Sequence, residues 1–468
     1  MSKTHENWEK MQARLLDLGE RVVSGARKAG ADVAEAVIGE GSHLSVKVRM
    51  REPELVEEAG SRSIGLRVMI GKQVAVSTTS DLSERGLARF IEDAVELARL
   101  SEADPFAGVP DSGLLSKPEQ HVELDLHDVR IDAIDGAAAL AHAKNAEAAA
   151  FDFDPRVTNS EGGNFGRASG ARAIVTSGGF RGVSRGTYAS LSVHPVVDDT
   201  TAEGGGGGKK RSGYYWTAKR HYAGLEPDRF VGEEAARRTL AKLGARKVET
   251  QECAVVFDPD VARSILGLIA SCINGGAIWR QSSYLVDRIG TAVASELVTI
   301  IDDPLIPQGP GSRAYDGEGL LSRRNVVIEK GKLESYLLDT YSARKLGKES
   351  TASASRGGSG GVSPGTTNFI LQPGTTSPGD IVKATQRGLY VTEMMGFGFN
   401  AVTGDFSRGA AGFWIENGEK TFPVSEVTVS LNLDQLLQRI DMVGSDLDLR
   451  SSVASPTFRV SSMTLAGR

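Results

Sequence analysis

The seven histidines of the chain show no spacing typical of a metal site. They are His5, His43, His121, His127, His142, His194 and His221, all in the first half of the sequence. No two of them are three or four residues apart, the spacing that places two imidazoles on one helical face for a shared metal ion. His121 and His127 are six residues apart with acidic neighbours, and we interpret them as surface residues.

Carboxylates offer a second kind of chemistry. Asp302 and Asp303 stand immediately before a proline, Asp316 and Glu318 lie in a glycine-rich segment, and Asp405 lies in a predicted turn. A pair of acids can act in general acid–base catalysis or bind Ca²⁺ or Mg²⁺. Adjacent acids before a proline are also typical turn formers, and we favour that interpretation.

Serine and lysine patterns do not predict a hydrolase or an ATPase of a known type. Ser184 and Ser359 both have the glycine spacing of a nucleophile elbow. An elbow needs a buried strand before the serine, a helix after it and a later histidine. No histidine follows His221, and the run after Ser184 predicts a strand. The glycine–lysine pairs precede Gln, Leu or Glu, where a P-loop needs Ser or Thr.

Hydrophobic spacing predicts the elements of the first 150 residues. Apolar residues at three- and four-residue intervals predict an amphipathic helix over Asn7–Lys28. Alternating runs separated by glycine or proline predict an antiparallel meander within 32–79. A second helix is predicted from a variant capping box, Asp81 with Glu84, to about residue 100. An alanine-rich helix is predicted over Val129–Ala150.

The rest of the chain alternates between predicted strands and helices. A β-like pattern covers 157–197, and Gly204–Gly208 predicts an irregular loop. A helix follows from Pro227 to near Gly244. Farther on, we predict a strand and then an apolar helix over Val261–Cys272, and a hairpin over Asn325–Leu338 that turns at Lys330.

The length of 468 residues predicts two or three domains. A stretch rich in Asp, Pro, Ser and Gly suggests one boundary near residue 118, and the end of a predicted helix suggests another near residue 245. We predict an α+β fold with an amino-terminal helix-and-meander domain over 1–118 and a central α/β domain over 119–245. The third domain, over 246–468, is predicted to be a glycine-rich, curved and mainly antiparallel sheet with packed helices.

Composition excludes several classes of protein. The 54 Lys and Arg residues nearly balance the 60 Asp and Glu residues, so a nucleic-acid partner is not expected. Two cysteines, Cys253 and Cys272, cannot form a disulfide framework, and we infer a reducing, cytoplasmic environment. No run approaches the roughly 20 apolar residues of a membrane-spanning helix, so no membrane association is expected.

Two long segments resemble a known family. Tyr336–Gly347 and Asn400–Glu419 closely resemble the TldE (PmbA) branch of the TldD/PmbA proteins, and 300–319 and the strand and helix around Phe257 also fit. The amino-terminal half fits more loosely. The resemblance implies a cytoplasmic heterodimeric peptidase that cuts unfolded or small peptides inside an enclosed cavity. In such a complex TldD carries zinc and TldE is its partner.

The resemblance also implies where a zinc site is missing. In TldD the zinc is held by a His-Glu-x-x-x-His helix and a later cysteine. Matching Arg280 to the arginine after that helix places Gly267, Leu268 and Cys272 at the His, Glu and second His positions.

These three residues cannot supply a hydrolytic zinc site. Such a site needs about three protein ligands, an open position for water and usually a carboxylate. Glycine and leucine supply neither ligand nor base, and no cysteine follows Cys272. We interpret Cys272 as a small buried packing residue, and we expect the apolar stripe of this helix, including Ile265 and Leu268, to fill the space where a metal ion would lie.

The sequence therefore predicts a non-catalytic, TldE-like subunit that closes the chamber and shapes the peptide channel. This chain is predicted to hold no cofactor, with zinc in a TldD-like partner. Its other partners are peptide substrates, bound by strand addition to a sheet edge, and whether the isolated chain forms a homodimer stays open. Candidate substrate contacts are polar side chains in the matched segments: Arg280, Ser282, Tyr284, Asp405 and Arg408. For Asp405 and Arg408, a turn stabilised by an ion pair is the alternative.

Two other interpretations remain open at this point. One is a free-standing homodimeric peptidase with a metal ion bound by carboxylates at Asp302, Asp303 or Asp316. The other is an adaptor or regulator without any peptidase role.

Overall fold

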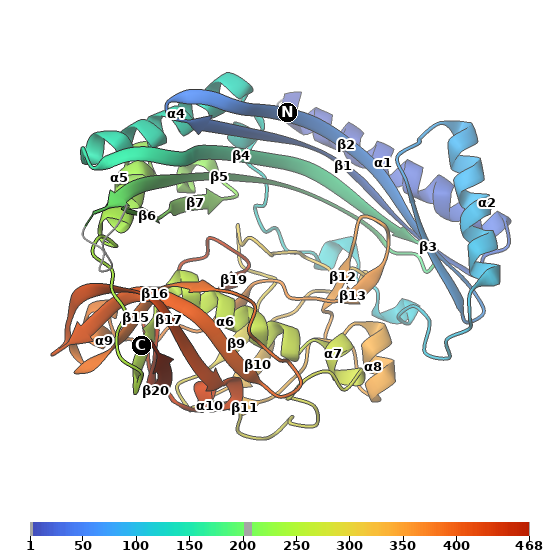
Figure 1. Ribbon diagram of the computed structural model, residues 1–468. Coiled ribbons are helices and arrows are strands. Elements are labelled where there is room, and N and C mark those ends of the chain that lie inside the picture. Colours follow the sequence, from blue (N-terminus) through green and yellow to red (C-terminus); the bar gives the residue numbers. More distant parts are fainter. Residues whose placement is uncertain (1–2, 201–207, 468) are drawn as a thin grey trace.

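The computed structural model describes residues 3–200 and 208–467, so most of the predicted loop Gly204–Gly208 lies outside the described residues. The chain forms two lobes, an amino-terminal lobe up to about residue 243 and a carboxy-terminal lobe from residue 251 (Figure 1). A long curved sheet of the first lobe arches over the second. The predicted α+β class with curved sheets is confirmed.

The amino-terminal lobe contains one sheet and five α-helices within the described residues. Its strands are β1 (Val33–Arg49), β2 (Glu52–Ile70), β3 (Gln73–Thr79), β4 (Val157–Thr176), β5 (Arg181–Asp199), β6 (Lys209–Ser212) and β7 (Tyr215–Lys219). Its helices are α1 (Lys3–Lys28), α2 (Glu84–Leu100), α3 (Val129–Asp132), α4 (Gly136–Phe153) and α5 (Asp228–Leu240).

The strands of this sheet are antiparallel and lie in the order β3-β2-β1-β4-β5-β6, with β7 also paired to β5. Because successive side chains of a strand point to opposite faces, alternate residues of β1, β4 and β5 share one face. That face packs against α1 and α2 at one end and against α4 and α5 at the other. The opposite, concave face is turned toward the carboxy-terminal lobe (Figure 1).

The pairing of β1 with β4 places the first two predicted domains in one sheet. Glu35 lies opposite Thr176, and Val48 lies opposite Gly163, so the pairing runs almost the full length of both strands. The structure therefore holds the segments on either side of residue 118 together through backbone hydrogen bonds.

Two predicted helix boundaries are wrong. Ser83, and not Asp81, caps α2, because the Ser83 hydroxyl accepts a hydrogen bond from the backbone N–H of Gly86 at 3.1 Å. The predicted helix over Val129–Ala150 is two helices, α3 and α4, with a break at 133–135. Asp135 in this break caps α4 by accepting from the N–H of Ala138 at 2.9 Å, so the chain restarts a helix there.

The carboxy-terminal lobe contains shorter elements. Its helices are α6 (Pro259–Cys272), α7 (Gly275–Trp279), α8 (Thr340–Leu346), α9 (Pro378–Lys383) and α10 (Leu433–Gln438). Its strands are β8 (Gln251–Phe257), β9 (Ile300–Asp302), β10 (Asn325–Glu329), β11 (Lys332–Leu333), β12 (Ala354–Arg356), β13 (Val362–Pro364), β14 (Phe369–Leu371), β15 (Arg387–Met395), β16 (Asp405–Glu416), β17 (Glu419–Asn432), β18 (Ile440–Val443), β19 (Val453–Ala454) and β20 (Phe458–Ala466).

One sheet of this lobe curls until its ends meet. Its order is β17-β16-β15-β8-β20-β18, and an additional pairing of β17 with β20 closes a ring of five strands. A second sheet has the order β11-β10-β9-β14-β19, and it includes the predicted hairpin, which turns at Lys330 and Gly331 as expected. Helix α6 packs its buried side chains into the core shared by these elements.

The lobes meet around a cavity. At one end, the loop after β12 lies so close to β2 that a Cβ atom at Gly65 would come within 2.4 Å of backbone atoms of Gly358 and Gly360. Only glycine fits there. Between the concave face of the sheet and the carboxy-terminal lobe lies a cavity of about 850 Å³.

Within the described residues, every helix is too short or too polar to cross a membrane.

Candidate functional site

The residues at the predicted zinc-ligand positions lie on α6. Asp258 caps this helix, and a proline stands at its first turn. A Cβ atom at Gly267 would meet no heavy atom within 4 Å, and Leu268 is only partly buried. On the apolar stripe, Ile265 is buried with 1% of its surface exposed, whereas the space beside Gly267 is open.

Cys272 has a different environment from Gly267 and Leu268. Its side chain is fully buried in the carboxy-terminal core, and burial raises the pKa of its thiol. The hydroxyl of Ser283 donates to its backbone carbonyl at 2.7 Å. A buried, protonated thiol is a poor metal ligand. Residues 267, 268 and 272 thus do not fit a hydrolytic zinc ion, since they provide neither an imidazole nor a carboxylate.

Three of the predicted substrate contacts lie just after α7. Arg280 is exposed and its guanidinium lies 4.9 Å from the ring centre of Trp279, while Ser282 is exposed and donates to the carbonyl of Arg280 at 3.3 Å. The backbone N–H of Tyr284 donates to the carbonyl of Ala401 at 2.8 Å. The structure therefore brings 280–284 next to the turn that precedes Asp405.

Asp405 and Arg408 lie at the start of β16 and are not paired with each other among the described residues. Asp405 accepts hydrogen bonds from Thr403 at 2.7 Å and from Asn432 at 3.2 Å, and these bonds lower its pKa. The guanidinium of Arg408 lies 5.7 Å from the ring centre of Phe406, and its Nε is buried without a hydrogen-bond partner. The alternative of an ion-paired turn is therefore not what the structure shows.

Two of the carboxylates considered as metal ligands, Asp302 and Asp316, accept hydrogen bonds from backbone N–H groups. Asp302 is buried and accepts from the N–H of Thr367 at 2.6 Å, and burial raises its pKa to about 6. Asp316 is buried and accepts from the N–H groups of Glu318, Leu320 and Ala354. Within residues 3–200 and 208–467, no three His, Cys, Asp or Glu side chains are placed to hold a metal ion together.

The cavity between the lobes has the character of a binding site. Its wall comes from β1, β2, β4 and β5 of the amino-terminal lobe, from the loop 121–127 and from 312–317 and 355–358 of the carboxy-terminal lobe. Arginines are frequent on this wall, which includes Arg172, Arg185, Arg220, Arg313 and Arg356. The predicted substrate contacts in the carboxy-terminal lobe are not among the residues that line it.

A buried ion-pair cluster holds the cavity wall together. Glu35 on β1 lies 2.9 Å from Arg67 on β2 and 3.0 Å from Arg356 on β12. Arg356 also donates to the carbonyls of Gly317 at 2.5 Å and Gly360 at 3.1 Å. Burial acts to raise the pKa of Glu35, but the charges of Arg356 and Arg67 outweigh it and the pKa is lowered. Glu35 therefore stays charged and joins the two lobes.

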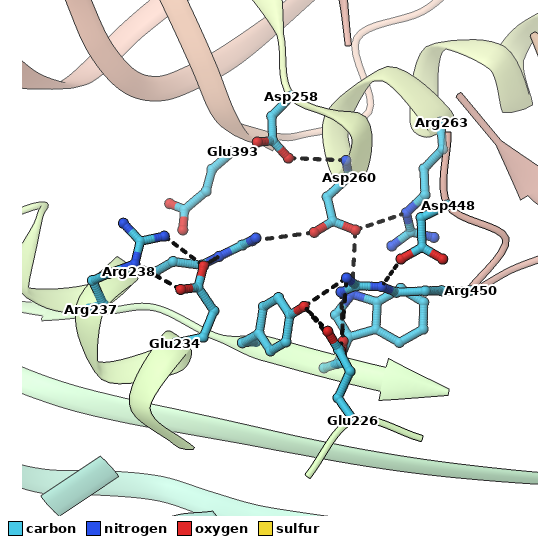
Figure 2. Close-up of polar contacts among 12 residues, drawn as sticks. Glu226, Glu234, Arg237, Arg238, Asp258, Asp260, Arg263, Glu393, Asp448 and Arg450 are labelled. Carbon is cyan, nitrogen blue, oxygen red and sulfur yellow. Dashed lines mark hydrogen bonds and ion pairs between the residues drawn. The ribbon is translucent and has the colours of Figure 1, made fainter. Parts of the chain in front are cut away.

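A second polar network joins the lobes at the other end of the sheet (Figure 2). Arg450 of the carboxy-terminal lobe donates to the Tyr215 hydroxyl at 2.7 Å and to the Trp216 carbonyl at 2.8 Å. Arg238 on α5 lies 3.5 Å from Asp260 on α6. Charged contacts thus join the two lobes at both ends of the sheet.

Sequence reasoning missed the residues of the cavity wall because they form no motif. Glu35 carried one signal: it is a single charge inside the apolar run 33–38, where an unpaired carboxylate is costly. Arg172 carried the same signal, since it stands between two alanines in an alternating strand. Nothing in the sequence indicated that these two strands pair and face the loop 312–317.

Family models match three consecutive parts of the chain. They are PmbA/TldA metallopeptidase domain 1 over residues 34–98, the central domain over 130–243 and the C-terminal domain over 250–467. Metalloprotease PmbA of Escherichia coli O157:H7 is 34% identical over 438 residues, which cover 94% of this chain and 93% of that protein. A Metalloprotease PmbA homolog of Haemophilus influenzae is 33% identical over 445 residues, covering 94% of each.

Solved structures share the whole fold. A proposed modulator of DNA gyrase from Bacteroides thetaiotaomicron superposes with a TM-score of 0.89 at 26% identity and covers 97% of this chain and 98% of that one. TldE from Thermococcus kodakarensis superposes with a TM-score of 0.85 at 21% identity, covering 96% and 100%, a likeness of fold alone. With the family models and the two relatives, these matches confirm the resemblance found in the sequence. The chain belongs to the PmbA/TldD family of metallopeptidases.

Proposed function

We propose that this chain is the non-catalytic, TldE-like subunit of a cytoplasmic metallopeptidase that cleaves unfolded or small peptides. Its partner in this proposal is a TldD-like subunit that holds the zinc ion, and this chain holds none. Its role is to close the chamber and to shape the channel through which peptides reach the partner's zinc.

The observation that carries the proposal is the chemistry of α6. A zinc peptidase needs imidazole or carboxylate ligands and a base for the attacking water. At the corresponding positions this helix has Gly267, which leaves open space, Leu268, which is partly buried, and Cys272, which is buried and protonated. Asp316 and Asp302 accept hydrogen bonds from backbone N–H groups, which disfavours a metal ion bound by these two carboxylates as well.

An open sheet edge supports the proposed peptide channel. Residues Arg181–Gly186 of β5 pair with β4 on one side, whereas β6 and β7 pair with β5 only from Ala189 onward. Val183–Gly186 line the cavity. An extended peptide placed along this edge gains backbone hydrogen bonds without any requirement for a particular side chain, so peptides of varied sequence fit this mode.

The test uses the purified chain with and without a purified TldD-like subunit. We expect the two chains to elute together on size-exclusion chromatography, and we expect cleavage of an unfolded peptide by the mixture but not by this chain alone. The isolated chain is run at several concentrations, because a homodimer is compatible with the proposal. If the two chains do not associate and the mixture does not gain cleavage, the proposal is overturned and an adaptor without a peptidase role is favoured.

A further inference from the structure

Four arginines on the cavity wall have no carboxylate partner. Arg172, Arg185, Arg220 and Arg313 all line the cavity, and none of them forms an ion pair with a described residue. Arg220 donates to the carbonyls of Gly309 and Pro310, and Arg185 lies 4.6 Å from the ring centre of Trp8. These contacts position the two side chains without an ion pair, although Asp132 and Glu123 lie near enough to Arg185 to favour its charged form.

The guanidinium edge of Arg313 that could bind both oxygens of a carboxylate has no partner. Its Nε and Nη2 are buried and have no hydrogen-bond partner. Elsewhere in the molecule these two nitrogens take both oxygens of a carboxylate: Arg459 holds Asp441 in this way, with both distances at 2.9 Å. The fork geometry of a guanidinium matches a carboxylate closely, so Arg313 lacks a partner of that shape.

Arg172 on β4 is a second arginine whose guanidinium has an unused hydrogen-bond donor. Its Nη2 donates to the carbonyls of Arg356 and Gly357, while its Nε is buried without a partner. Burial, together with the nearby positive charges of Arg356 and Arg313, lowers its pKa. An anion between Arg172 and Arg313 would relieve this repulsion.

The acids nearby are engaged elsewhere. Asp316 accepts from three backbone N–H groups, and Glu35 is shared by Arg67 and Arg356. Glu40 lies 2.5 Å from Arg14, and Glu123 accepts from the N–H of Asp125, which itself accepts from Gln308 at 2.7 Å. Asp316 and Asp302 oppose part of the positive charge of Arg313, but among the described residues neither accepts a hydrogen bond from its Nε or Nη2.

Tyr315 supplies a neutral donor beside the two arginines. Its ring packs against Phe180 and His121, with ring centres 4.9 Å apart in both cases. A Cβ atom at Gly182 would lie 2.6 Å from this ring, so glycine is needed there for the ring to reach the sheet. Burial raises the pKa of Tyr315 to about 12, against the effect of a hydrogen bond with Ser184, so the hydroxyl keeps its proton and can donate.

We propose that Arg172, Arg313 and Tyr315 form a subsite for a carboxylate group of the peptide in the cavity. The proposal rests on the proposed function for the presence of a peptide. Arg313 offers its free Nε and Nη2 edge to the carboxylate, the positive charge of Arg172 adds to the attraction, and Tyr315 donates to an oxygen. The carboxylate comes from the carboxyl terminus of the peptide or from an acidic side chain, and the wall does not distinguish these two sources by charge alone.

The test compares three peptides that carry an uncharged fluorophore at the amino terminus. The first is the hexapeptide Ser-Ala-Ser-Ala-Ser-Ala with a free carboxyl terminus, the second is its amide, and the third is the amide with glutamate in the middle. Binding to the full-length chain is followed by fluorescence anisotropy. We expect at least one peptide with a carboxylate to bind about ten-fold or more tightly than the neutral amide, since a charge-assisted hydrogen bond contributes at least about 1.4 kcal/mol. The first and third peptides tell the two sources apart.

Variants assign the preference to the subsite. Arg313→Gln and Arg172→Gln are expected to reduce the ten-fold preference to less than about two-fold, and Tyr315→Phe to reduce it about three-fold, while binding of the neutral amide stays the same. Arg85→Gln, an exposed arginine on α2, is the matched control and keeps the preference. If an arginine variant does not fold, as judged by its melting curve, Tyr315→Phe decides.

Two outcomes would overturn the subsite. One is equal binding of all three peptides to the unchanged chain, or no binding of any of them. The other is a preference for carboxylates that survives the variants of Arg313, Arg172 and Tyr315. Either result leaves the proposed function intact, because that function is judged by association with a TldD-like subunit and by gain of cleavage.

Discussion

Arg356 and Glu35 form an ion pair across the boundary between the two lobes, with 3.0 Å between Nη2 and Oε2. Both side chains are buried, with 0% and 1% of their surface exposed, and Arg67 approaches the same Oε2 atom at 2.9 Å. Two positive charges thus depend on one carboxylate in the interior. Removing one member of a buried pair leaves an uncompensated charge, which costs far more than the loss of an exposed pair.

The first prediction concerns this carboxylate. Glu35→Gln is expected to lower the free energy of unfolding by about 3 kcal/mol or more, because Arg67 and Arg356 lose their shared counter-charge. Urea denaturation at pH 7 measures the loss. Glu57→Gln removes an exposed carboxylate 3.7 Å from His43 and should change stability by less than about 0.5 kcal/mol. Equal effects of the two variants would contradict the role assigned to Glu35.

A second prediction follows from the pKa of Asp302. Burial raises this pKa to about 6, whereas an aspartate in an unfolded chain titrates near about 3.9. Between these values the folded state keeps a proton that the unfolded state releases. The contribution of Asp302 to stability is therefore full below about pH 4 and is lost as the pH rises toward 6, by roughly 2 to 3 kcal/mol.

Asp302→Asn removes this titration, so we expect a flatter dependence of stability on pH between about 4 and 6 than for the unchanged chain. Thermal unfolding across this pH range provides the measurement, with Glu329→Gln on the exposed side of β10 as the control for removal of an acid. A pH profile that Asp302→Asn leaves unaltered would show that the carboxyl of Asp302 does not titrate in this window.

A third prediction separates the two faces of α6. Ile265 is buried in the carboxy-terminal core, whereas Ser271 on the same helix is exposed. Ile265→Asp places an unpaired charge in that core and should cost about 4 kcal/mol or prevent folding. Ser271→Asp should cost less than about 1 kcal/mol. Comparable melting temperatures for the two variants would speak against the placement of this helix.

A fourth prediction concerns Cys272 in the proposed complex. If no metal depends on its thiol, Cys272→Ala should leave the zinc content of the complex unchanged and its peptidase activity within a few-fold. A modest loss of stability, about 1 to 2 kcal/mol, is expected from the small cavity. Elemental analysis of the purified complex is the measurement, and loss of zinc in this variant would show that Cys272 is a ligand.

Elements with strong local signals could be predicted from the sequence. The periodicity of the first helix, the apolar stripe of 261–272 and the glycine turn at Lys330 all correspond to elements of the structure. Each depends on residues close together in the chain. The break before α4 was missed because alanines on both sides continue a helical pattern, and only the cap made by Asp135 shows where the second helix starts.

The cavity wall could not be predicted, since its parts are distant in the sequence. Glu35 and Arg356 are more than 300 residues apart, and Arg172 and Arg313 are more than 100 residues apart. Long-range pairing leaves no periodic signal in either segment. The family resemblance pointed to the carboxy-terminal segments instead, where Tyr284 and Ala401 do lie together but outside the cavity.

The most direct test of the account is the metal content and peptidase activity of the purified chain, measured alone and after mixing with a TldD-like subunit. We predict less than about 0.1 zinc per chain and no cleavage when it is alone, and zinc-dependent cleavage after mixing. One tightly bound transition-metal ion per chain, together with cleavage of an unfolded peptide in the absence of any partner, would contradict the claim that this subunit lacks a catalytic site.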